Sequence, residues 1–132
     1  MNTTANPVGL GKHLVIELMG CCPEKLNDPV FLQETMENAA RDAGATVMSS
    51  HFHTFEPQGV TGVVVLSESH ISIHAWPELG YAAADVFTCG EHVRPSIAAS
   101  KLHLALEAET SNMVQIIRGV GPEFPLLPDK IL

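Results

Sequence analysis

The sequence predicts an α+β fold, a two-layer sandwich in which a mainly antiparallel sheet carries two helices on one face. With 132 residues, 45% of them apolar, the chain is long enough for one domain with its own core. Six stretches have strand-like patterns and two have helical ones. Four of the strand-like stretches follow one another with only short turns between them, which favours antiparallel pairing. We therefore expect a single domain over residues 1–132.

The first strand is expected at residues 12–19, where polar and apolar side chains alternate. A helix follows, because Asp28 can cap its start, Pro29 suits its first position and Gly44 suits its end. Its apolar side chains recur at helical spacing and define the buried face: Leu32, Met36, Ala39 and Ala43.

The next four strands are expected at 46–55, 59–66, 69–76 and 81–89, separated by breaks that contain proline and glycine. A second helix is expected at 95–107 and a last strand at 112–118, followed by an extended proline-rich end from Pro122. Apolar residues occupy both faces of the central strands: Val63, Val65, Ile71 and Ile73. This favours a homodimer that covers the face left open by the helices.

Charge and composition narrow the range of partners. Seven Lys and Arg residues against 15 Asp and Glu give a net charge of −8, which disfavours nucleic acid and attracts cations. No apolar run approaches the ~20 residues of a membrane helix, and residues 1–9 lack a signal-peptide pattern. The three cysteines, including the adjacent Cys21 and Cys22, form no disulfide framework, and we expect that pair to serve packing. The expected compartment is the cytoplasm.

Reactive side chains concentrate in residues 66–78, which hold two histidines, three serines, two carboxylates and a tryptophan, and Cys89 follows. Composition alone leaves several interpretations open. A zinc site is one, although the familiar zinc motifs are absent; its ligands would come from His51, His53, His70, His74 and Cys89. A serine hydrolase is another, although no Gly-x-Ser-x-Gly elbow is present. The plainest interpretation, hydrogen bonding at a polar sheet face, is preferred for His13, His51, His53, His70, His92 and His103.

The motifs themselves are more specific than the composition. Ser67-Glu-Ser-His70, Ile73-His-Ala-Trp-Pro-Glu78 and the stretch 80–90 closely resemble the prokaryotic S-adenosylmethionine decarboxylase proenzymes. The resemblance extends to about residue 119 and includes four upstream stretches: 11–15, 44–46, 52–55 and 59–65.

This resemblance implies that the chain cuts itself between Glu68 and Ser69, into a β chain of residues 1–68 and an α chain of 69–132. It implies that Ser69 becomes a covalent pyruvoyl cofactor, whose ketone forms a Schiff base with the substrate. His74 is then expected to transfer protons during processing, and Thr61, where relatives usually carry serine, to polarise the ester intermediate. Cys89 is the expected proton donor in catalysis.

The resemblance also implies a substrate and an assembly. S-adenosylmethionine would lose CO₂ and become the aminopropyl donor for spermidine synthesis, bound by Phe55, Trp76 and Glu78 in pockets between the two protomers of a homodimer, with no metal. A rival hypothesis keeps the cofactor but decarboxylates ornithine or arginine, because Glu56 and Gln58 replace residues that are commonly apolar or aromatic.

Two hypotheses from different classes of protein also stand at this point. A non-catalytic homologue would keep the Glu68–Ser69 bond intact and bind zinc through the histidines. A structural dimer module would leave the combination of Ser69, His74 and Cys89 unexplained.

Overall fold

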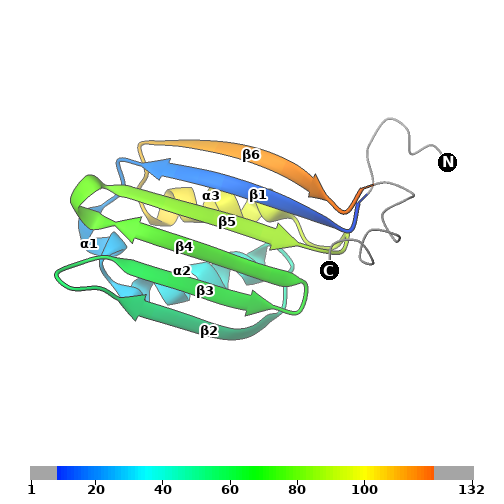
Figure 1. Ribbon diagram of the computed structural model, residues 1–132, viewed down its shortest axis with the longest axis horizontal. Helices are drawn as coiled ribbons and strands as arrows, with labels where there is room; N and C mark the ends of the chain where they lie inside the picture. The colour runs from blue at the N-terminus through cyan, green and yellow to red at the C-terminus, as the bar shows by residue number, and fades with distance from the viewer. Residues whose placement is uncertain (1–8, 121–132) are drawn as a thin grey trace, which may run out of the picture.

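The computed structural model describes residues 9–120 and contains one six-stranded antiparallel sheet with strand order β2-β3-β4-β5-β1-β6. The helices α2 and α3 lie side by side across one face of that sheet (Figure 1). The predicted α+β sandwich is therefore confirmed, whereas the proline-rich end lies outside the described residues. The strands are β1 (Gly11–Met19), β2 (Val47–Thr54), β3 (Val60–Leu66), β4 (Ser69–Trp76), β5 (Tyr81–Thr88) and β6 (Thr110–Arg118). The helices are α1 (Pro23–Leu26), α2 (Pro29–Asp42), α3 (Pro95–Ala105) and the 3₁₀ turn η1 (Pro77–Leu79).

Helix α2 begins where its capping residues predict. The Asp28 side chain accepts a hydrogen bond from the Phe31 N–H at 3.0 Å, and Pro29 occupies the first helical position. The face that α2 buries carries Leu32, Met36, Ala39 and Ala40. The four-residue helix α1 was not predicted, because one turn is too short to give a periodic pattern.

Alternation along the strands divides the sheet into two chemically different faces. The helix-covered face is buried and supplies most of the core, including Ile16, Leu18, Val64, Ile71, Ile73 and Val86. The opposite face, here called the open face, has no helix over it among the described residues (Figure 1). It retains partly exposed apolar side chains: Val15 (36% exposed), Val65 (37%), Ile116 (45%) and Val114 (62%). Within residues 9–120, none of the helices is both long and apolar enough to cross a membrane.

Replacing Asp28 with alanine should lower the free energy of unfolding by about 1 kcal/mol, because the Phe31 N–H loses its side-chain acceptor. Urea denaturation followed by circular dichroism would measure this. Asp28→Ser is the matched control and should stay close to wild type, since serine is an equally good cap. Equal stability of the alanine and serine variants would contradict the capping role.

Candidate active site

The predicted cleavage point lies at the tip of a tight hairpin. Leu66 pairs with Ser69, so that only Ser67 and Glu68 connect β3 to β4. Two-residue hairpins normally use glycine or asparagine at positions of positive φ, and this turn has neither. Instead Ser69 takes a φ of 150°, a region populated almost only by glycine. Such a conformation costs on the order of 1–3 kcal/mol. The strain lies in the backbone of Ser69, which contributes the nitrogen of the Glu68–Ser69 peptide bond.

Cys89 contacts this peptide bond through two different groups. Its backbone N–H donates a hydrogen bond of 2.9 Å to the carbonyl oxygen of Glu68. Its thiol lies 3.8 Å from the hydroxyl of Ser69. A backbone N–H in this position can stabilise negative charge that develops on the carbonyl oxygen during nucleophilic attack. The sequence predicted a role for the thiol but not for the N–H, whose position depends on how β5 pairs with β4.

The side chain of Glu68 is also anchored. Its two carboxylate oxygens are bound by the Thr46 N–H at 3.1 Å and by Nε2 of His92 at 3.0 Å. The hydrogen bond to His92 and the one from Thr46 lower the pKa of the Glu68 carboxyl to about 2. The sequence analysis, which interpreted His92 as an ordinary hydrogen-bonding histidine, therefore missed its contact with Glu68 at the predicted cleavage point.

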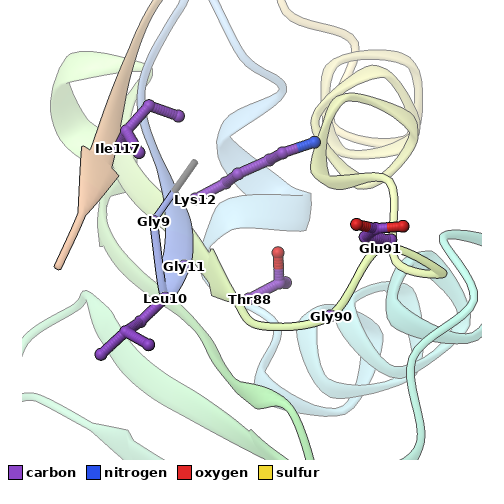
Figure 2. A pocket seen from close by; sticks show the side chains of 8 residues that line it. All are labelled: Gly9, Leu10, Gly11, Lys12, Thr88, Gly90, Glu91 and Ile117. Carbon is purple, nitrogen blue, oxygen red and sulfur yellow. The ribbon is translucent and has the colours of Figure 1, made fainter. Parts of the chain in front are cut away.

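A cavity of about 490 Å³ lies beside the end of β5 (Figure 2). Lys12 and Thr88, which are paired across β1 and β5, extend their side chains from neighbouring strands into this region. Thr88 also pairs with Ser69 on its other side. Its hydroxyl is buried and has no hydrogen-bond partner among the described residues. The residues lining the cavity are Gly9, Leu10, Gly11, Lys12, Thr88, Gly90, Glu91 and Ile117.

A second pocket, of about 340 Å³, gathers most of the other predicted site residues. Thr61 and His74 lie in it with the Thr61 hydroxyl 3.1 Å from Nδ1 of His74. The indole of Trp76 stacks on Tyr81 with ring centroids 5.2 Å apart, and the Tyr81 hydroxyl donates to Glu17. The pocket is lined by Phe55, Gln58, Gly59, Thr61, His74, Ala75, Trp76 and Glu78.

The predicted site residues thus form two groups at opposite ends of the sheet (Figure 1). Glu68, Ser69 and Cys89 lie at one end, and the pocket with His74 lies at the other. Ser69 and His74 belong to the same strand and are five residues apart, which corresponds to about 16 Å along an extended chain. Within one protomer, His74 therefore cannot contact the Ser69 hydroxyl.

A polar network occupies the open face between the two ends. Nε2 of His13 lies 2.6 Å and Nε2 of His70 lies 3.5 Å from one carboxylate oxygen of Asp85. Burial raises the pKa of Asp85, but hydrogen bonds from Ser72 and His13 lower it more, so the net shift is downward.

His13, His70 and Asp85 have donor atoms within 4.8 Å of one another, so these three residues are spaced to hold a metal ion. They differ from the predicted zinc ligands, of which only His70 takes part. The Arg118 guanidinium donates to Nδ1 of His13 at 2.9 Å, which leaves the ring proton on Nε2, facing Asp85. A metal-bound histidine carries the opposite arrangement, so the described state is a hydrogen-bonded network.

The fold and the site together define a class of small α+β proteins whose strained hairpin presents a serine next to a polarised peptide carbonyl. Comparison with known proteins is more specific. A model of the S-adenosylmethionine decarboxylase family matches residues 12–119, and the chain belongs to that family.

Individual relatives agree with this assignment. The chain is 51% identical over 111 residues to the S-adenosylmethionine decarboxylase proenzyme of Methanococcus maripaludis, covering 84% of this chain and 91% of that protein. It is 54% identical over 100 residues to the proenzyme of Parasynechococcus marenigrum, covering 76% and 78%. The crystal structure of the adenosylmethionine decarboxylase from Aquifex aeolicus superposes with a TM-score of 0.81 at 37% identity, covering 88% of this chain and 96% of that one.

The hydrogen bonds of Glu68 predict a pH dependence of folding stability, to be measured in the Ser69→Ala chain, which lacks the hydroxyl that the predicted cleavage requires. A folded-state pKa lowered from 4.5 to about 2 means that Glu68 stabilises the fold above pH 4.5 and loses this contribution as the pH falls toward 2. Thermal unfolding of Ser69→Ala, with and without Glu68→Gln, should be compared from about pH 6 down to about pH 2. The difference in melting temperature between the two chains should shrink over that range, because protonation of Glu68 removes its contribution. The other carboxylates titrate in both chains, so their effects cancel. A constant difference would contradict the assignment.

Proposed function

We propose that this chain is a self-cleaving proenzyme that becomes a pyruvoyl-dependent decarboxylase of S-adenosylmethionine. The main support for the proposal is the geometry at Glu68–Ser69. The Ser69 backbone has a φ of 150°, and the Glu68 carbonyl accepts a hydrogen bond of 2.9 Å from the Cys89 N–H. The strained backbone of Ser69 and the polarised carbonyl of Glu68 both favour attack on this one peptide bond. The membership in a family whose relatives are named proenzymes supports the same conclusion.

Self-cleavage follows from the residues at the hairpin. The Ser69 hydroxyl adds to the carbonyl carbon of Glu68, while the Cys89 N–H holds the oxygen on which negative charge develops. The carbon–nitrogen bond then breaks, the Ser69 nitrogen takes up a proton to become a free amine, and an ester is left between the two residues. Removal of the Ser69 α-proton expels Glu68 as a carboxylate and leaves dehydroalanine at residue 69. This tautomerises to an imine, and addition of water followed by loss of ammonia gives the pyruvoyl ketone.

The surroundings of Ser69 suit such a group. A pyruvoyl ketone bound to a substrate amine draws electrons from the bond to the substrate carboxylate, which allows CO₂ to leave. The thiol of Cys89, 3.8 Å from the Ser69 hydroxyl, is close enough to deliver the proton that replaces CO₂. The cavity beside Thr88 offers about 490 Å³ next to this end of the sheet for part of the substrate.

The second pocket favours S-adenosylmethionine over a basic amino acid. It contains the aromatic rings of Phe55 and Trp76, which can stack on an adenine or face a sulfonium cation. Glu78 also lines it and can accept hydrogen bonds from ribose hydroxyls. Glu56, the carboxylate that would favour a diamine-forming substrate, is not among the lining residues, although Gln58 is.

We further propose that the site is completed by a second copy of the chain in a homodimer. The Ser69 end and the His74 pocket are separated by about 16 Å within one protomer, as the strand spacing requires. In such a dimer the open faces of the two protomers pack together, and the two-fold axis lies between the sheets, perpendicular to the strands. This arrangement brings the Ser69 end of one protomer to the pocket end of its partner. The exposed Val15, Val65, Val114 and Ile116 on that face favour burial in such an interface.

The cellular setting follows from the chemistry and the resemblance. The product, decarboxylated S-adenosylmethionine, would supply aminopropyl groups for spermidine synthesis. All three cysteines of the chain are free, as a cytoplasmic enzyme that uses the Cys89 thiol requires.

Intact-mass measurement of freshly synthesised protein should show the 14.2 kDa chain converting into two fragments that end and begin at Glu68 and Ser69. The later fragment should have no free amino terminus. The cleaved protein should release CO₂ from carboxyl-labelled S-adenosylmethionine and not from ornithine or arginine.

Ser69→Ala is the control for this experiment and should remain a single inactive chain. A wild-type chain that never splits would overturn the proposed function. Cleavage together with release of CO₂ from ornithine or arginine alone would retain the cofactor and replace the substrate.

Co-expression of the Ser69→Ala and His74→Ala chains should restore self-cleavage that neither chain shows alone. If Ser69 uses His74 from the partner, each mixed dimer contains one complete pair, formed by the serine of the His74→Ala chain and the histidine of the other. Random pairing then leads to cleavage of roughly half of the His74→Ala chains. Different affinity tags distinguish the two chains in a mass spectrum.

Mixed dimers isolated through both tags, in which the His74→Ala chain remains intact, would exclude the shared site. They would require His74 to act on the Ser69 of its own protomer. Cleavage of the His74→Ala chain expressed alone would instead show that His74 has no role in cleavage.

A further inference from the structure

We propose that His92 is a positioning residue for self-cleavage, which acts through the Glu68 side chain to hold the scissile carbonyl against the Cys89 N–H. The inference rests on the proposed function and adds a residue to it. The Nε2 atom of His92 lies 3.0 Å from the carboxylate of Glu68, so its influence on the scissile bond passes through that side chain.

Three chain segments meet at this point, at the end of the sheet where β3 joins β4 and β5 ends (Figure 1). The turn between α2 and β2 supplies the Thr46 N–H to one Glu68 oxygen, and the Thr46 carbonyl accepts from the Ser67 N–H at 3.0 Å. The loop after β5 supplies His92 to the other oxygen. That loop is itself tied to the turn by the Arg94 N–H, which donates to the Ala43 carbonyl at 2.9 Å.

Two glycines allow His92 to reach this position. Gly90 has a φ of 90°, and a β-carbon there would lie 2.9 Å from the His92 ring. Gly44 has a φ of 95°, and a β-carbon there would lie 2.7 Å from the His92 carbonyl oxygen. Since both backbones adopt conformations that favour glycine, the loop and the turn can approach closely only with these residues. The contact between His92 and Glu68 therefore depends on the backbone conformation at these two glycines.

Glu68, which supplies the carbonyl group of the scissile bond, is consequently held both at that carbonyl and at its side-chain carboxylate. The Cys89 N–H binds the Glu68 carbonyl, while Thr46 and His92 bind its carboxylate. The side chain of His92 is 60% exposed and that of Glu68 is 13% exposed, so solvent weakens this contact, and it supplies only part of the stabilisation that Glu68 gives to the fold. Its effect lies in fixing the orientation of the peptide unit relative to its hydrogen-bond donor.

This orientation matters in two steps of cleavage. When the Ser69 oxygen bonds to the Glu68 carbon, the carbonyl oxygen gains negative charge, and a rotated peptide unit would move that oxygen away from the Cys89 N–H. When the bond between the Ser69 β-carbon and its oxygen breaks, that oxygen stays on Glu68, which leaves as a second carboxylate beside its own side chain. Donors at His92 and Thr46 reduce the repulsion between the two negative groups.

The test is the rate at which full-length chains made in a short cell-free synthesis convert into the two fragments, followed by intact mass. His92→Ala should slow this rate by roughly tenfold to a hundredfold, because misplacing a reacting group by a fraction of an ångström has effects of this size. His92→Gln, whose amide can still donate to Glu68, should recover most of the rate. His103→Ala is the matched control, since His103 bonds Ser111 and does not contact the hairpin, and it should cleave like wild type.

Two further measurements separate positioning from folding. In the Ser69→Ala chain, His92→Ala should lower the melting temperature by no more than Glu68→Gln does, and in the Glu68→Ala chain it should cause no additional slowing. The inference is overturned if His92→Ala cleaves at the wild-type rate, if it slows Glu68→Ala by the same factor as wild type, or if it lowers the melting temperature by more than Glu68→Gln does. A wild-type chain that does not cleave would instead overturn the proposed function itself.

Discussion

The short connection between β3 and β4 is the constraint on which the rest of the site depends. With only Ser67 and Glu68 to reverse the chain and no glycine among them, the backbone deviation falls on Ser69. The same register sets the Glu68 carbonyl opposite the Cys89 N–H, because β4 and β5 pair antiparallel from Ser69 and Thr88 onward. Strain and polarisation thus converge on one peptide bond as a consequence of strand pairing.

The sheet that positions the Glu68–Ser69 bond also separates this bond from the second group of site residues. Side chains at Thr61, His74 and Trp76 follow the open face toward the other end of β3 and β4, and Phe55 and Glu78 join them from the adjoining loops. Between the ends lie the network of His13, His70 and Asp85 and a row of partly exposed valines. A face with this composition, left uncovered by α2 and α3, is suited to contact with a second copy, and the proposed homodimer would bring the two separated groups of site residues together.

Much of the fold could be predicted because local signals were strong. Asp28 and Pro29 defined the start of α2, β4 has the predicted bounds of Ser69 and Trp76, and the alternation of polar and apolar side chains at residues 12–19 predicted β1. Weaker signals failed where a segment was short or lacked periodicity. Helix α1 was missed, and β6 begins at Thr110, two residues before the predicted start. The identity of the reactive residues came from their motif, while their grouping into two ends followed only from the pairing of the strands.

By itself, the sequence determined the α+β class, the order of the elements and the residues that carry reactive groups, because these depend on side-chain chemistry and on spacing along one segment. The tertiary structure decided which of those groups meet. His92 and Thr46 reach Glu68 across 24 and 22 residues of sequence, and the Cys89 N–H reaches the Glu68 carbonyl through the pairing of β4 with β5. Contacts of this kind depend on long-range strand register and on the close approach of two loops at Gly44 and Gly90, and neither has a local pattern in the sequence.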